Sequence, residues 1–169
     1  YGLRRWAIMA ANRDGSGLVR LGSYFRAAEQ PRINDAGQVV WQAFDGRNYE
    51  IWTAWADGTG VQRITNNDAN SWHADINNHG RIVWDQWDGT DYEIFSANFD
   101  GSDVVQITNR PYGGTGLRPD DNWPRINDQN RVVWFGRVGS NWEIYSANAD
   151  GTGLLRLTTS ALDNEFPQL

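Results

Sequence analysis

The sequence predicts an all-β fold built from repeated four-stranded antiparallel units, and three observations support it. Short runs rich in Val, Ile, Trp, Tyr and Thr alternate with Asp-Gly turns, a pattern typical of strands joined by tight hairpins. The apolar spacing that marks an amphipathic helix is absent. The third observation is that the whole pattern recurs along a chain of 169 residues that contains 10 Trp and 18 Gly.

The repeat is measured from two anchors. The Asp of one Asp-Gly turn recurs at intervals of 43, 43 and 50 residues, at Asp14, Asp57, Asp100 and Asp150. A second anchor recurs at intervals of 43, 50 and 43 residues, at Pro31, Ala74, Pro124 and Pro167. The seven extra residues fall in the Pro- and Gly-rich connection 109–123, which reads as a loop. A repeat of about 43 residues with four strands is typical of a β-propeller blade.

Each unit is expected to contain four strands in order. In the second unit they are 31–34, 38–44, 49–55 and 60–65, separated by turns that carry Asp35, Asp45 and Asp57. The second strand holds an aromatic in one register, at Trp41, Trp84 and Trp134. Since blades bury both faces against their neighbours, we expect these Trp side chains to pack between blades rather than bind a ligand.

We interpret residues 1–169 as a single propeller domain or segment. Its repeats are 1–30 (partial), 31–73, 74–123, 124–166 and the start of another at 167–169. Tyr1 matches Phe44 and Leu169 matches Ile33, so the chain lacks the second strand of one blade. An incomplete blade exposes apolar surface and unpaired strand edges. We therefore expect either a segment of a larger ring or self-association in which chains complete one another.

The stretches "PRINDAGQVVW", "DGRNYEIW" and "ADGTGVQRIT", with their downstream counterparts, resemble the TolB-like β-propeller repeat family. The resemblance covers essentially the whole chain. The family is widespread in periplasmic and secreted bacterial proteins, so the resemblance implies an extracytoplasmic location. It also implies three kinds of role, because such propellers serve as binding scaffolds, as gating domains of peptidases and occasionally as enzymes.

Composition excludes several partners. The formal net charge is −6, and all 15 basic residues are Arg, which argues against nucleic acid as a partner. No run of 18 apolar residues could span a membrane. The absence of Cys excludes disulfides and thiolate metal sites. The chain begins with Tyr1 and shows no leader, which we interpret as a processed or excised segment.

The turn between the second and third strands is rich in oxygen ligands. It carries Asp45, Asn48 and Glu50 in one unit and Asp88, Asp91 and Glu93 in the next, whereas the third copy replaces the first Asp with Val138. These residues are weak candidates for calcium, which takes six to eight oxygen ligands. Asp and Asn also cap hairpins through backbone hydrogen bonds, and the sequence favours that role. No cofactor is expected otherwise.

Catalytic motifs are missing, so the sequence predicts a non-catalytic protein. His73 and His79 are the only histidines, and they lack both HExxH spacing and an evident third metal ligand. No G-x-S-x-G elbow is present. The "GGTGLRPDD" stretch at 113–121 lacks the Lys of a phosphate loop.

The expected binding surface is a rim at the mouth of the central channel. The residues just ahead of each innermost strand vary between copies, and they are Glu29, Gln30, Trp72, His73, Asn122, Trp123, Glu165 and Phe166. Variation on one rim of a repeat frame is how repeat scaffolds diversify a binding surface. Exposed Trp beside carboxylates and amides suits a peptide or a sugar ring. The alternative is a purely structural role, in which Trp72, Trp123 and Phe166 fill gaps between blades.

The sequence thus predicts a binding or scaffolding propeller whose ligand, a protein segment or a glycan, contacts Trp72, His73, Asn122, Trp123, Glu165 and Phe166. Two alternatives remain open. One is the propeller of a larger enzyme, such as a peptidase of the prolyl oligopeptidase type. The other is a structural unit that assembles through its blade edges.

Overall fold

The computed structural model describes residues 5–110 and 119–159 of the chain. Within these ranges all regular structure is β-strand, in three four-stranded antiparallel sheets and one two-stranded sheet. The strands are β1 (Trp6–Ala10), β2 (Val19–Phe25), β3 (Ala28–Ile33), β4 (Gln38–Phe44), β5 (Tyr49–Trp55), β6 (Gln62–Arg63), β7 (Ser71–Ile76), β8 (Arg81–Trp87), β9 (Tyr92–Asn98), β10 (Val105–Gln106), β11 (Asp121–Ile126), β12 (Arg131–Val138), β13 (Asn141–Asn148) and β14 (Leu155–Arg156).

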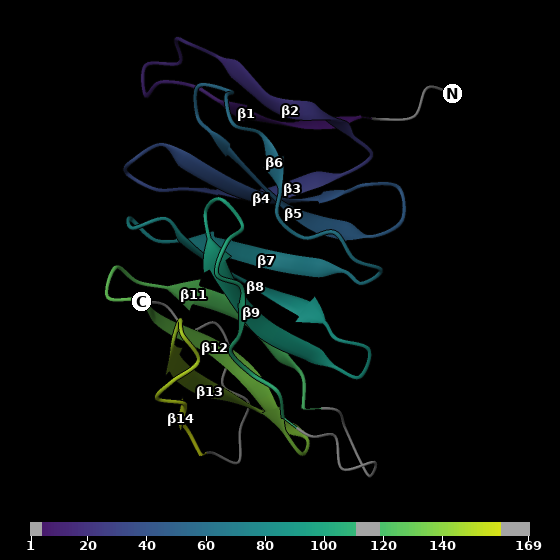
Figure 1. Cartoon of the computed structure of the whole chain (residues 1–169), viewed down its shortest axis with the longest axis vertical. Helices are drawn as coiled ribbons and strands as arrows, with labels where there is room; N and C mark the ends of the chain where they lie inside the picture. Colours follow the sequence, from purple (N-terminus) through teal and green to yellow (C-terminus); the bar gives the residue numbers. More distant parts are fainter. Residues whose placement is uncertain (1–4, 111–118, 160–169) are drawn as a thin grey trace.

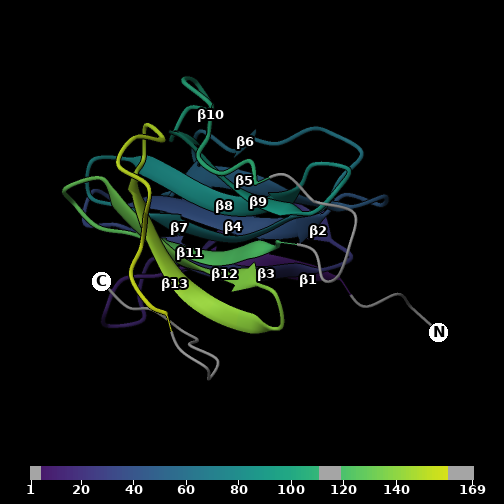
Figure 2. The same ribbon diagram turned by 90° about the horizontal axis from the view of Figure 1, so that it is seen from below.

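Each sheet is one propeller blade, and strand order within it follows the chain. Blade 1 is β1–β2, blade 2 is β3–β6, blade 3 is β7–β10 and blade 4 is β11–β14. The blades succeed one another from β1–β2 to β14 as an open series (Figure 1), and Figure 2 looks along that series. The predicted propeller of four-stranded antiparallel blades is confirmed. Among the described residues no helix could cross a membrane.

The predicted strands are right at the centre of the blade and wrong at its edges. β4 and β5 begin and end where the sequence predicts, since Asp-Gly and Asn turns bound them on both sides. The innermost strand was expected at 31–34 but begins at Ala28. The outermost strand was expected at 60–65 but is only Gln62–Arg63. Short outer strands leave little unpaired backbone for edge-to-edge aggregation.

The core lies between successive blades, as the Trp register predicts. Trp41, Trp84 and Trp134 are all at most 1% exposed. Trp41 packs with residues of blades 1 and 2, Trp84 with blades 2 and 3, and Trp134 with blades 3 and 4. Because each Trp fills the space between two sheets, the hydrophobic effect that folds a blade also holds it to its neighbour.

A polar connection joins the blades at the turn after the innermost strand. The Asn34 amide donates to the backbone oxygen of Asn77 (2.8 Å), and the Asn77 amide donates to that of Asn127 (3.0 Å). The same residue of each unit therefore bonds the next blade. Each of these backbone oxygens also accepts an N–H of its own turn, from Gly80 and Asn130 respectively, so the amide adds a second hydrogen bond that crosses between blades.

Candidate functional site

The rim residues lie inside the innermost strands, at bulges, and not ahead of them as the sequence predicted. The register of β7 shifts between Trp72 and Asp75, and β3 and β11 shift at the matching positions. Gln30, His73 and Trp123 adopt left-handed φ angles of 52°, 53° and 56°. A bulge inserts one extra residue without ending the pairing, which is why each strand extends past the predicted start.

The bulges of β7 and β11 are each held by the second strand of the preceding blade. The backbone N–H of His73 donates to Gln42 Oε1 on β4 (2.7 Å), and that of Trp123 donates to Asp85 Oδ1 on β8 (3.1 Å). At a bulge the backbone N–H does not face the neighbouring strand of its own sheet, so these bonds give it an acceptor. The side chains one residue after the core Trp therefore position the rim.

Asp85 is the functional candidate that the sequence analysis missed. It is fully buried, and its Oδ1 lies 2.7 Å from His73 Nδ1 while also accepting the Trp123 N–H. Its Oδ2 has no hydrogen-bond partner among the described residues. Burial raises the pKa of this carboxyl, and the bond with His73 opposes that rise. A buried carboxyl oxygen without a partner is costly, which makes this position unlike an ordinary core site.

Repeat register holds the signal that could have identified Asp85. The residue after the core Trp is Gln42, Asp85 or Phe135, and the bulge residue of the same blade is Gln30, His73 or Trp123. Within each blade the two residues are therefore chemically matched. Blade 2 pairs two amides, blade 3 pairs a carboxylate with an imidazole, and blade 4 pairs two aromatic rings. Position 85 varies just as the rim varies, although it is buried.

Aromatic rings form two close pairs along the rim, one tilted and one stacked. Tyr49 lies 3.9 Å from Trp72 between ring centroids, and His73 lies 3.8 Å from Trp123 with 22° between the planes. Trp72 and Trp123 are half-buried, so the expectation of freely exposed indoles is wrong. Each indole has one face covered by another ring and keeps only part of its surface for a partner.

The remaining predicted rim residues are placed as follows. Glu29 accepts a hydrogen bond from the Tyr49 hydroxyl at 3.2 Å. Asn122 is half-buried on β11, opposite Phe135. Glu165 and Phe166 lie outside the described residues. Blades 2, 3 and 4 thus contribute Glu29, Trp72, His73 and Trp123 to one polar and aromatic edge, whereas no contact connects Asn122 to these side chains among the described residues.

The calcium candidates act as hairpin and strand connectors in blade 2. The Asn48 amide donates to Glu50 Oε1 (2.9 Å) and to the backbone oxygens of Asn67 and Ala69. Glu50 also accepts from the Thr65 hydroxyl, which ties the third strand to the outermost one. Asp45 accepts two backbone N–H groups of its own turn. These contacts match the capping role that the sequence favoured.

Blade 3 differs because Asp91 replaces the amide donor. Carboxylate oxygens of Asp88, Asp91 and Glu93 all lie within 4.8 Å of one another. Burial above all, with the carboxylates of Asp121 and Asp91 acting in the same direction, raises the pKa of Glu93 to about 8. The proton that Glu93 holds stabilises the fold at acid pH, and this contribution is lost as the pH rises toward 8. Neither histidine joins a group of three metal-ligating side chains in the described residues.

We expect EDTA to leave the melting temperature almost unchanged. Three carboxylates fall short of the six to eight oxygens that calcium takes. Asp88 already accepts two backbone N–H groups, and Glu93 accepts the Thr108 hydroxyl and the Arg110 N–H. Differential scanning fluorimetry with EDTA and with added calcium measures the effect. Asp91→Asn, which copies Asn48, is the matched control. A drop of many degrees in the wild type but not in this variant would establish a calcium site.

The comparisons with known proteins concern the fold. No family model matches this sequence, and no curated protein matches it. A TolB-type protein from Agrobacterium tumefaciens is similar in structure, with a TM-score of 0.69, 16% identity, and coverage of 95% of this chain and 64% of that chain. TolB from Acinetobacter baumannii is similar with a TM-score of 0.67 and 18% identity, and the match covers 94% of this chain and 39% of that chain. Puromycin hydrolase is similar with a TM-score of 0.65 and 15% identity, and the match covers 90% of this chain and 25% of that chain. The chain therefore spans less than two thirds of these proteins and has a TolB-like propeller fold.

Proposed function

We propose that this chain, a series of TolB-like propeller blades, is a non-catalytic binding module. Its ligand contacts the rim through Trp72, His73, Asn122 and Trp123. The sequence also nominates Glu165 and Phe166, which lie outside the described residues. The resemblance to periplasmic and secreted propellers supports a location outside the cytoplasm.

The observation that carries the proposal is the contact between half-buried His73 and fully buried Asp85. A carboxylate with one unpartnered oxygen is costly in a core, and Gln42 performs the same backbone-holding task in blade 2 without a charge. Perturbed, buried titratable groups beside an open edge are typical of binding sites. Asp85 holds one nitrogen of His73, so the ring presents its other nitrogen in a defined orientation.

The ligand is proposed to be a protein segment, with a glycan as the other outcome. Sugar rings bind best on a broad open indole face, whereas Trp72 and Trp123 each have a face covered by Tyr49 or His73. The edges and polar tips that remain suit hydrogen bonds to a peptide. Peptide recognition also accounts for the mixture of a carboxylate, an amide and an imidazole along one edge.

Replacing Trp72 or Trp123 with Ala is expected to weaken ligand binding about tenfold or more, with a much smaller effect on folding. Both side chains are half-buried at the rim, whereas core Trp side chains are fully buried. Labelled protein applied to arrays of 15-residue peptides and of glycans identifies the ligand class. Trp55→Ala is the matched control, because Trp55 is 39% exposed and lies outside the rim. Equal loss of binding in that control would contradict the proposal.

A second candidate is the propeller of a larger peptidase. It is favoured by the structural similarity to puromycin hydrolase, of which this chain spans a quarter. It predicts an α/β-hydrolase segment elsewhere in the parent protein. Reading the flanking gene sequence separates the two candidates, since a binding module requires no such segment.

A further inference from the structure

A polar cavity lies between blades 3 and 4, at the ends of β7 and β11 that point away from the rim. It measures about 450 Å³, within the range of about 300–1,000 Å³ that is typical of small-molecule pockets. The turns after β7, β9, β11 and β13 line it, together with the start of β8. Its side chains carry carboxylate, amide, imidazole and guanidinium groups, and Ala149 is the one apolar residue of the described lining.

Repeat register shows why there is room for this cavity. At the interface of blades 2 and 3, Trp55 ends the third strand and packs edge-on against Phe99, with 5.3 Å between ring centroids. At the interface of blades 3 and 4 the same two positions hold Asn98 and Ala149. An amide and a methyl group fill less space than two aromatic rings, so a space stays open between the blades.

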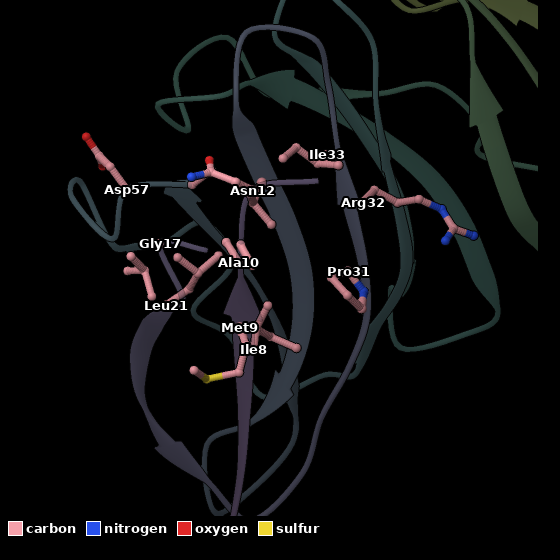
Figure 3. Close-up of a pocket in the computed structure, with 14 residues that line it drawn as sticks. Ile8, Met9, Ala10, Asn12, Gly17, Leu21, Pro31, Arg32, Ile33 and Asp57 are labelled. Carbon is pink, nitrogen blue, oxygen red and sulfur yellow. The ribbon is translucent and has the colours of Figure 1, made fainter. Parts of the chain in front are cut away.

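Asp103 brings a carboxylate to a position where the other repeats have Gly. Its counterparts Gly17, Gly60 and Gly153 adopt left-handed φ angles of 64°, 63° and 65°. Asp103 keeps this conformation at a φ of 53°, although a side chain makes it less favourable. Figure 3 shows the corresponding place between blades 1 and 2, where Gly17 and Asp57 line a cavity and Gly17 supplies no side chain. Residues in such conformations cluster at functional sites.

Asn130 makes the same kind of replacement on the side of blade 4. Its counterparts Gly37 and Gly80 have φ angles of 81° and 75°, whereas Asn130 has a φ of 57°. Asn130 Oδ1 accepts the Asn77 amide at 2.8 Å, so its Nδ2 remains as a donor. Two Gly positions of the repeat, one in each blade, therefore carry polar side chains that line the same cavity.

Pairing with Arg81 does not account for Asp103. Asp103 Oδ2 accepts Arg81 Nη1 at 2.7 Å, but the Asp103 side chain is 66% exposed, and such pairs contribute little stability. Arg81 also donates to three further acceptors in blades 3 and 4. The matched residue Arg131 donates to Asn148 Oδ1 and to the backbone oxygen of Gly153. An Arg at this position is thus held in blade 4 with Gly in place of the Asp.

The lining favours an uncharged ligand that is rich in hydroxyl groups. The Arg81 guanidinium already donates to four acceptors, which leaves it little to offer an anionic group. Asp103 and Asp150 offer carboxylate oxygens as acceptors, Asn130 offers N–H groups, and Gln129 offers both. A hydroxyl both donates and accepts, so neighbouring hydroxyls of one ring can bond a carboxylate and an amide together.

We propose that this cavity binds a neutral sugar ring. A sugar that lies flat on the rim needs an open indole face, whereas a cavity surrounds the ring with hydrogen bonds from two blades. The cavity lies at the opposite end of β7 from Trp72 and His73, so it does not depend on the function of the rim.

The test records amide NMR spectra of the labelled whole chain, titrated separately with glucose, galactose, mannose and N-acetylglucosamine. At least one sugar is expected to shift the backbone amide signals of Asp103, Asn130 and Asp150, with a dissociation constant of about 1 mM or lower. No saturable shift with any of these sugars would overturn the proposal. Shifts confined to Trp72 and Trp123 would assign sugar binding to the rim instead.

Asp103→Gly copies the other repeats and is expected to weaken sugar binding at least about tenfold. Gly adopts a φ of 53° without strain, so this variant keeps its fold, which its melting temperature verifies. Asp68→Gly is the matched control, because it removes an exposed carboxylate that pairs with Arg47 outside the cavity, and it should bind the sugar normally. Unchanged affinity in Asp103→Gly, or an equal loss in Asp68→Gly, would contradict the proposed site.

Two further measurements separate hydrogen bonding from charge. Asp103→Asn keeps an acceptor without the charge and is expected to bind the sugar more tightly than Asp103→Gly does. The reverse order would contradict a hydrogen-bonded sugar. Putrescine, a diamine, is the probe for a cationic occupant. Saturable shifts of the Asp103 and Asp150 signals with putrescine, together with no sugar binding, would overturn the proposal.

Discussion

Replacing Trp84 with Ala is expected to lower the free energy of unfolding by roughly 3–5 kcal/mol. Trp84 is 1% exposed and belongs to the core cluster between blades 2 and 3. Its ring stacks on Phe95 at 5.9 Å, and its Nε1 donates to Gln86. Truncation leaves a cavity between two sheets that cannot close without moving a blade, so the cost includes both lost burial and lost packing.

Urea unfolding of the purified chain measures this effect. Trp55→Ala is the control, because Trp55 is 39% exposed and packs edge-on against Phe99 alone among the aromatic rings. Its cost should be clearly smaller. If Trp84→Ala hardly changes the free energy of unfolding, that side chain lies at a surface. The repeated Trp would then not hold neighbouring blades together.

Replacing Arg110 with Ala is also expected to cost roughly 3–5 kcal/mol near pH 7, because it leaves a buried carboxylate without its partner. The Arg110 guanidinium donates to both oxygens of Asp121, at 2.7 and 3.1 Å, and Asp121 is fully buried. Asp121 also accepts from Trp134 Nε1 at 2.9 Å, so the ion pair touches the core of blade 4. The guanidinium further lies over the Tyr145 ring.

The cost of Arg110→Ala should fall on acidification. Burial raises the pKa of Asp121 from its ordinary 3.8 to about 6, and Arg110 opposes that rise. A raised carboxyl pKa favours folding at low pH, and this contribution is lost as the pH rises through the folded value. Without Arg110 the pKa rises further, so the variant loses more stability than the wild type between pH 5 and pH 7.5.

Chemical unfolding at the two pH values tests this dependence. Arg47→Ala is the matched control, since Arg47 pairs with Asp68 at 2.8 Å with both side chains exposed, and it should cost less than about 1 kcal/mol at either pH. An equal loss of unfolding free energy in the two variants, or a loss in Arg110→Ala that does not change with pH, would mean that buried Asp121 does not need Arg110 as a partner.

The middle of each blade could be predicted from local patterns. The limits of β4 and β5 follow from turn signals within a few residues, and the burial of Trp41, Trp84 and Trp134 follows from one repeated register. The first strand was harder, because a bulge at Gln30, His73 and Trp123 adds a residue that no turn signal marks. The bulges at His73 and Trp123 depend on an acceptor that the backbone N–H meets in the preceding blade, which is long-range information.

The candidate site shows the same division. His73 and Trp123 could be nominated from sequence because they vary within a repeat frame. Asp85 could have been found only by comparing the residue after the core Trp between repeats, since a single carboxylate in the middle of a strand looks like an ordinary polar position. Its partners lie 12 and 38 residues away, on another strand and another blade.

The sequence by itself determined the blade architecture, because hairpins depend on residues that are neighbours along the chain and because the pattern is repeated often enough to be recognised. Only the tertiary structure decided where a buried charge meets the rim. That position depends on which atoms face one another across two strands and two blades, which no local pattern in the sequence records.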